Sequence, residues 1–118
     1  MSRSVRDRLR DIQTAIGKVY EYRRSLVGPH ADMALSAVLR EIGVIGEAVN
    51  SLPEWATTQR SEIPWRQIAA MRNFLVHEYF NIDASVVEDV IVNDLDPLAV
   101  AVEAILANVG DSADPPDI

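Results

Sequence analysis

Residues 63–79 read IPWRQIAAMRNFLVHEY, and this stretch combines the signals of one helix with the side chains of a reactive site. Proline is favoured in the first turn of a helix, so Pro64 predicts a helix that begins at this point. Apolar side chains then recur three or four residues apart, at Ile68, Met71 and Leu75. This spacing predicts a helix that turns these three side chains toward a core.

The polar side chains of the same stretch fall on a different arc of the predicted helix. At about 100° per residue, Arg72, Asn73, His77 and Tyr79 share an arc of roughly 160°. Asn73 and His77 are four residues apart, a spacing at which the amide can orient the imidazole. The same arithmetic places Glu78 on the core side, and we therefore expect the regular helix to end near His77.

Three further apolar stripes, with steps of three, four or seven residues, predict three more main helices. The first stripe comprises Val5, Leu9, Ile12, Ile16, Val19 and Leu26. The second comprises Leu35, Val38, Ile42, Ile45 and Val49. The last comprises Leu98, Val102, Ile105 and Val109.

Turn and capping residues set the expected boundaries of these helices. The first helix should end before the Gly28-Pro29 pair, because this pair breaks helical structure. Asp83 is expected to cap a short extra helix, and Asp96 with Pro97 should provide the cap and first turn of a separate last helix.

These elements predict an all-α protein, an up-and-down four-helix bundle with a short extra helix before the last one. Gly43 and Gly46 both weaken the second helix, and we expect tight packing against another helix to explain them. The helical domain should span residues 1–110, and the acidic, proline-rich segment 111–118 should be a disordered tail.

The composition limits the classes of function. The chain of 118 residues is nearly half hydrophobic and has no cysteine, which favours a single cytoplasmic domain without disulfides. No segment is long and apolar enough to predict a membrane span. All 11 basic residues lie at or before Arg72, whereas residues 74–118 carry 10 acidic residues. The chain therefore lacks a broadly basic surface, and any contact with RNA should be local.

The polar arc has a chemical interpretation. Arginine is a permanently charged, forked donor suited to phosphate, and histidine can give and take protons near neutral pH. Together Arg72 and His77 suit metal-free cleavage of an RNA phosphodiester by its own 2′-hydroxyl. They lie about 7.5 Å apart along the helix axis, and two copies of the helix facing each other would bring such groups together. Ala69, in the middle of the arc, would let a second surface approach closely.

The same residues resemble a known family. The pattern of Arg72, four residues, His77, one residue and Tyr79 is similar to the motif of the HepT-like toxins in the HEPN superfamily. The resemblance extends over roughly residues 5–110. It includes the blocks IGEAV at 45–49, IPWRQIAAMRN at 63–73, HEYFNID at 77–83 and DLDPL at 94–98.

The resemblance implies a small helical toxin that forms a homodimer and cleaves RNA without a metal or cofactor. It places the catalytic cleft at the dimer interface, with Arg72 and His77 as catalytic residues and Asn73 as a supporting polar residue. It also implies a partner, an MntA-like minimal nucleotidyltransferase antitoxin, that neutralises the toxin by transferring AMP to Tyr79. Glu47 lies within one of the matching blocks, and the sequence gives it no role.

Two other interpretations remain open. The chain could be a non-catalytic helical accessory or nucleotide-binding subunit that docks a minimal nucleotidyltransferase. It could also be a plain helical dimer without a catalytic role. Loss of partner binding in His77→Ala, with toxicity never seen, would favour the first. A monomer with Arg72 and Tyr79 buried in its own core would favour the second.

Overall fold

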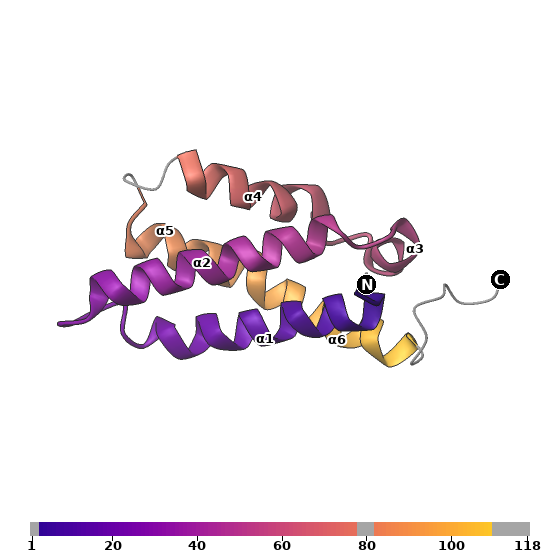
Figure 1. Cartoon of the computed structure of the whole chain (residues 1–118), viewed down its shortest axis with the longest axis horizontal. Helices are drawn as coiled ribbons and strands as arrows, with labels where there is room; N and C mark the ends of the chain where they lie inside the picture. The colour runs from indigo at the N-terminus through magenta and orange to yellow at the C-terminus, as the bar shows by residue number, and fades with distance from the viewer. Residues whose placement is uncertain (1–2, 78–81, 110–118) are drawn as a thin grey trace.

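The computed structural model describes residues 3–77 and 82–109, apart from the side chain of Val76. Every regular element in these ranges is helical. The two longest helices, α1 (Val5–Arg23) and α2 (Ala31–Asn50), lie side by side and run in opposite directions (Figure 1). The predicted all-α class is confirmed.

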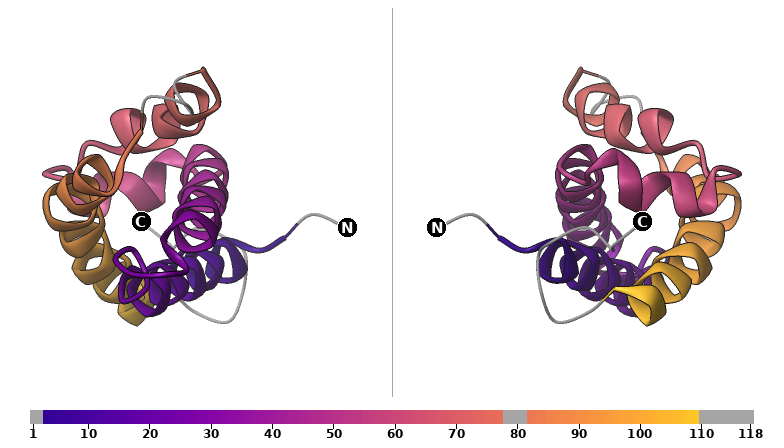
Figure 2. Two further views of the ribbon diagram at one scale, coloured as in Figure 1. Left: turned by 90° about the vertical axis from the view of Figure 1, so that its left-hand side faces the viewer. Right: turned by 90° about the vertical axis from the view of Figure 1, so that its right-hand side faces the viewer.

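The other main helices pack on the two sides of this pair. α4 (Trp65–His77) packs against α2, and α6 (Asp96–Asn108) packs against α1. Seen end-on, α4, α2, α1 and α6 follow one another around the bundle (Figure 2). Successive main helices reverse direction, as the predicted up-and-down bundle requires.

A short helical connection leads into α4. It consists of α3 (Glu54–Thr57) and the 3₁₀ turn η1 (Thr58–Arg60). The indole Nε1 of Trp65 donates a hydrogen bond to the carbonyl oxygen of Arg60 at 3.0 Å. This bond fixes the start of α4 to the connection that precedes it.

The predicted extra helix is α5 (Ala84–Val90), and Asp83 caps it as expected. The Asp83 carboxylate accepts hydrogen bonds from the backbone N–H groups of Ser85 and Val86 at 3.0 and 3.1 Å. The hydrogen bonds from the Ser85 hydroxyl and from these N–H groups hold the pKa of Asp83 below its usual value.

The prediction of a separate cap at Asp96 is wrong. A π-helical segment, η3 (Ile91–Leu95), runs directly from α5 into α6, and the residue before Asp96 is already helical. Ile91, Leu95 and Leu98 are all fully buried on this run. Burial of this continuous apolar face explains why the backbone stays helical where the local sequence indicates a break.

The four predicted stripes line one core. Their residues are buried except Leu35, Met71 and Leu75, which pack against the core while partly exposed. Fully burying an aliphatic side chain of this kind contributes roughly 1.5–3 kcal/mol, so the stripes account for the assembly of the bundle.

Polar contacts tie α1 to the C-terminal half of the fold. Arg23 forms a forked ion pair with Glu88, in which Nη2 lies 2.6 Å from Oε2 and Nε lies 2.9 Å from Oε1. The Tyr20 hydroxyl donates a hydrogen bond to Asp96 Oδ1 at 2.6 Å. Partial burial and this bond to the carboxylate raise the pKa of Tyr20 to about 12.

The structure does not test two expectations about the C-terminal end of the chain. The predicted disordered tail at 111–118 lies outside the described residues, and the proposed domain limit at 110 stays a prediction. Within the described residues, no helix has the length and hydropathy needed to span a membrane.

Candidate active site

Gly46 sets how closely α4 approaches α2. A Cβ atom added at Gly46 would lie 3.2 Å from the carbonyl oxygen of Ala69 and 3.3 Å from that of Ile68. It would also lie 3.4 Å from the Cβ of Arg72. The absence of a side chain at Gly46 therefore lets the backbone of α4 rest on α2, as expected for this glycine. The same expectation was wrong for Gly43, because a Cβ there would meet nothing within 4 Å.

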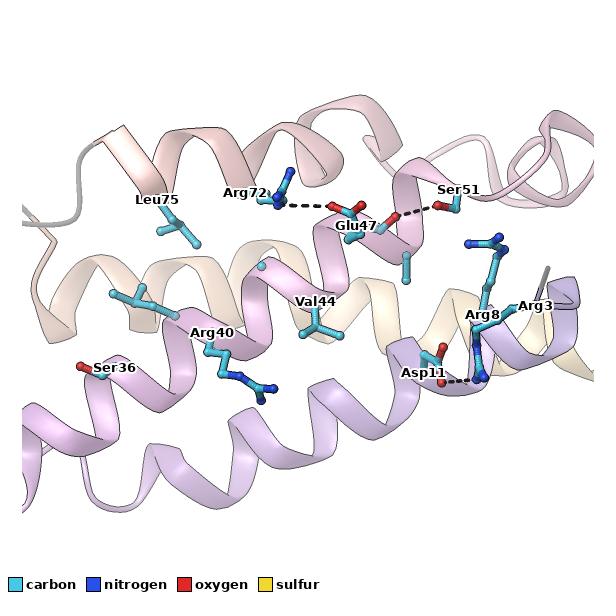
Figure 3. Close-up of a pocket in the computed structure, with 13 residues that line it drawn as sticks. Arg3, Arg8, Asp11, Ser36, Arg40, Val44, Glu47, Ser51, Arg72 and Leu75 are labelled. Atoms are coloured by element: carbon cyan, nitrogen blue, oxygen red, sulfur yellow. Dashed lines mark hydrogen bonds and ion pairs between the residues drawn. The ribbon is translucent and has the colours of Figure 1, made fainter. Parts of the chain in front are cut away.

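The close approach puts the base of Arg72 against α2. The guanidinium then extends along the surface of α2 toward Glu47, and its Nε lies 3.2 Å from Glu47 Oε2 (Figure 3). Both side chains are more than half exposed, at 57% and 65%. The ion pair therefore sits in solvent, where a ligand with its own negative charge can reach the guanidinium.

Asn73 and His77 follow Arg72 along α4. Both are exposed, and so is Phe74 between them, which keeps 54% of its surface accessible. The Cβ of Arg72 approaches α2 at Gly46, and Asn73 lines one hollow together with Arg72, whereas His77 does not line it.

Ala69 also differs from the expectation. It is half-buried, and its backbone carbonyl lies beside Gly46. The surface that approaches this part of α4 is α2 of the same chain. At Ala69 the contact with Gly46 is made by the backbone carbonyl.

A small hollow of about 270 Å³ joins Arg72 to Asn73. Its walls come from α2 and α4, and Glu47, Asn50 and Arg66 also line it. Two arginines and two side-chain amides therefore converge on one recess. Such a set can donate several hydrogen bonds to a phosphate group.

His77 lines neither this hollow nor the larger groove on the other side of Arg72. It is the last described residue of α4, about 7.5 Å along the axis from Arg72. Tyr79 and Glu78 lie outside the described residues, and so does the expected end of the helix after His77. Within one chain, the described residues do not bring Arg72 and His77 to a common point.

Among the described residues, no three His, Cys, Asp or Glu side chains are grouped so that they could hold a metal ion. The charged groups that accompany Arg72 are Glu47 and Arg66. The pairing of Glu47 with Arg72 was missed by sequence reasoning. The only signal was that Glu47 directly follows the glycine on which α4 rests.

Comparisons with known proteins show the family of the chain. A family model described as "Ribonuclease HepT-like" matches residues 12–105. A "Probable ribonuclease HepT" of Thermococcus cleftensis is 36% identical over 101 residues, which cover 83% of this chain and 92% of that protein.

Two further relatives carry provisional names as RNases. One, from Caldanaerobacter subterraneus subsp. tengcongensis, is 37% identical over 70 residues, covering 59% of this chain. The other, from Methanocaldococcus jannaschii, is 34% identical over 73 residues, covering 62% of this chain. The chain spans 62% and 60% of the lengths of these two relatives. No solved structure matches the chain.

Proposed function

The chain belongs to the HepT-like ribonuclease family, and from that premise we propose that it is a metal-independent endoribonuclease, the toxin of a toxin–antitoxin pair. Arg72 and His77 are its catalytic residues. The observation that carries the proposal is Arg72 itself, whose exposed guanidinium opens on a recess with Arg66 and Asn73.

The proposed reaction is an internal transfer at phosphorus. The 2′-oxygen of a ribose forms a bond to the adjacent phosphorus, and the bond from that phosphorus to the 5′-oxygen breaks. The products are a 2′,3′-cyclic phosphate and a free 5′-hydroxyl. His77 acts as general base on the 2′-hydroxyl or as general acid on the leaving oxygen, and Arg72 stabilises charge on the phosphorus oxygens.

The reaction requires two copies of the chain. Arg72 and His77 diverge on one helix, so Arg72 of one copy works with His77 of the other across a two-fold axis. Phe74 supports this arrangement, because it is a large exposed apolar residue between Asn73 and His77. Ala70, also exposed, gives the same face of α4 a small residue where another helix can approach. We assign this face to the homodimer contact.

Asn73 has a supporting role in the proposed site. It lies four residues before His77 and one residue after Arg72, and it lines the same hollow as the arginine. Its amide can hold the imidazole in one orientation or donate to the phosphate. Loss of this amide should therefore reduce the rate without abolishing the fold.

Tyr79 is the proposed point of control. An MntA-like nucleotidyltransferase would bring ATP, whose α-phosphorus is attacked by the tyrosine oxygen, and pyrophosphate would leave. The attached AMP adds bulk and negative charge two residues beyond His77. Such a group would block RNA and could pair with an arginine of the site.

The test uses purified wild-type protein, a mixed RNA substrate and EDTA. We expect cleavage with cyclic-phosphate ends, loss of cleavage in His77→Ala, and retention in Tyr79→Phe. Intact mass after treatment with the cognate nucleotidyltransferase and ATP should show added AMP on wild type and none on Tyr79→Phe. Intact RNA after incubation with unmodified dimer would overturn the ribonuclease proposal. In that case, binding of the transferase would support the accessory-subunit interpretation.

A further inference from the structure

We propose that the groove between α1, α2 and α4 holds a single strand of RNA on its way to Arg72. This proposal rests on the ribonuclease function proposed above, and it assigns the substrate path on the same chain. The groove, here called the arginine groove, has a volume of about 830 Å³ and is lined by Arg3, Arg8, Arg40 and Arg72. The four arginines come from three different helices or their ends (Figure 3).

The charges of the groove are unusual for this chain. The whole protein carries a net charge of −7, yet the groove gathers four arginines against two lining acids, Asp11 and Glu47. Arg3 pairs with Asp11 at 2.7 Å, Arg40 pairs with the buried Glu41 at 3.0 Å, and Arg72 pairs with Glu47. Arg8 forms no ion pair with any described residue. The positive charge of Arg8 therefore remains to attract a polyanion, and the paired arginines can still offer their outer N–H groups.

The floor of the groove is apolar. Leu39, Val44, Ala48 and Leu75 contribute to it, and none of the described residues that line it is aromatic. A basic rim above an apolar floor suits a strand whose phosphates face the rim while unpaired bases or riboses lie on the floor. The basic and apolar side chains that line the groove suit recognition of the RNA backbone more than of base sequence.

A second copy of the chain is a less suitable occupant. In a two-fold contact the same surface meets itself, so this groove would bring together two copies of Arg8, which has no ion-pair partner among the described residues. Burial of that excess charge is unfavourable. The exposed face of α4 around Phe74 offers an apolar contact without this repulsion.

The arginine groove adjoins the proposed catalytic site, which supports the proposed RNA path. Arg72 lines both the arginine groove and the hollow that contains Asn73. A strand in the groove would therefore reach the cleavage residues at one end. Arg3 and Arg8, near the start of α1, would hold phosphates farther along the strand.

The experiment measures binding separately from cleavage. His77→Ala protein is titrated against a fluorescent single-stranded RNA at several salt concentrations, and the anisotropy gives Kd. Arg3→Gln and Arg8→Gln are introduced in that background, with Arg24→Gln as the control. Arg24 is exposed at the other end of α1 and does not line the groove. Arg40 is left intact because it pairs at 3.0 Å with the buried Glu41.

We expect each groove variant to raise Kd several-fold and to lower the salt slope by about one, whereas Arg24→Gln leaves both near wild type. Equal weakening in all three variants would mean diffuse attraction and would overturn the proposal. A change in oligomeric state on size-exclusion chromatography would assign the groove to self-association and overturn it too. If wild type cleaves RNA but the groove variants bind RNA normally, only the proposed RNA path through the arginine groove is overturned. If wild type binds through the groove but never cleaves, only the ribonuclease proposal fails.

Discussion

Arg72 Nε lies 3.2 Å from Glu47 Oε2, and Glu47 is next in sequence to the glycine on which the stem of Arg72 rests. One short segment of α2 therefore contacts Arg72 at two points along its side chain. Gly46 holds the base of the side chain close, and Glu47 contacts the guanidinium by Nε. The outer edge of the guanidinium is left for a phosphate.

Glu47 should act as a positioning residue for Arg72. Replacing it by Ala removes the contact that orients the guanidinium, and we expect kcat to fall about tenfold with a smaller change in KM. Glu47→Gln keeps an acceptor for Nε and should retain more activity. Steady-state kinetics on a short RNA measures both values.

Glu103→Gln is the matched control, because Glu103 is an exposed acid on α6 far from the pair in sequence. The stability of the Glu47 variants should change by no more than about 1 kcal/mol, since the ion pair is exposed. Unchanged or increased kcat in Glu47→Ala would remove the positioning role.

The two glycines of α2 should respond differently to the same substitution. Gly43→Ala adds a methyl group into open space and should stabilise the fold by about 0.5–1 kcal/mol through helix propensity. Gly46→Ala meets two backbone carbonyls within 3.3 Å, so its propensity gain should be lost to displacement of α4. In thermal unfolding, Gly43→Ala should have a higher Tm than Gly46→Ala. Equal stabilisation by both would contradict the close approach.

Phe74 should be needed for the proposed dimer. Phe74→Glu puts a charge where two copies of α4 would meet, and we expect a monomer with little cleavage but with the wild-type helical content. Val100→Glu provides the control, because Val100 is likewise exposed, at 60%, but lies on α6. Light scattering gives the oligomeric state. A dimer of Phe74→Glu with full activity would place the interface elsewhere.

Tyr20 should give the protein a stability step at high pH. Its pKa is raised from 10.0 to about 12, so the folded state favours the neutral hydroxyl. The stability from this hydroxyl is complete below its unfolded pKa near 10 and is lost as the pH rises through about 12.

Tyr20→Phe should lack that alkaline step and lose about 0.5 kcal/mol at neutral pH, because the hydrogen bond to Asp96 is partly exposed. Urea unfolding of both proteins between neutral pH and the alkaline limit measures the difference. If the free energy of unfolding of the two proteins varied with pH in the same way, Tyr20 would not be responsible for the alkaline step.

Much of the fold was predictable because it depends on local signals. The apolar stripes and Pro64 predicted the main helices, and the carboxylate of Asp83 caps α5 as its type and position indicated. Asp96 carried the same kind of signal, but the prediction that it caps the last helix was wrong. Around it, buried leucines on both sides favour a continuous helix, and its carboxylate accepts a bond from Tyr20 instead.

The site was only partly predictable, because its geometry depends on how two helices pack. Helical arithmetic grouped Arg72 with Asn73 and His77 on one arc. The arithmetic does not include the position of α2, whose Gly46 draws the stem of Arg72 into contact. The partnership with Glu47 depends on that register between α2 and α4 and could not be read from spacing along one helix.

The central claim is that one Arg72 and one His77 from different copies form each catalytic site. The direct measurement mixes Arg72→Ala protein with His77→Ala protein under conditions of subunit exchange, with EDTA present, and follows RNA cleavage. Each variant alone should be inactive. A mixed dimer retains one site in which both residues are intact, so cleavage should return on mixing. Continued inactivity, with mixed dimers demonstrated by mass, would contradict the shared site.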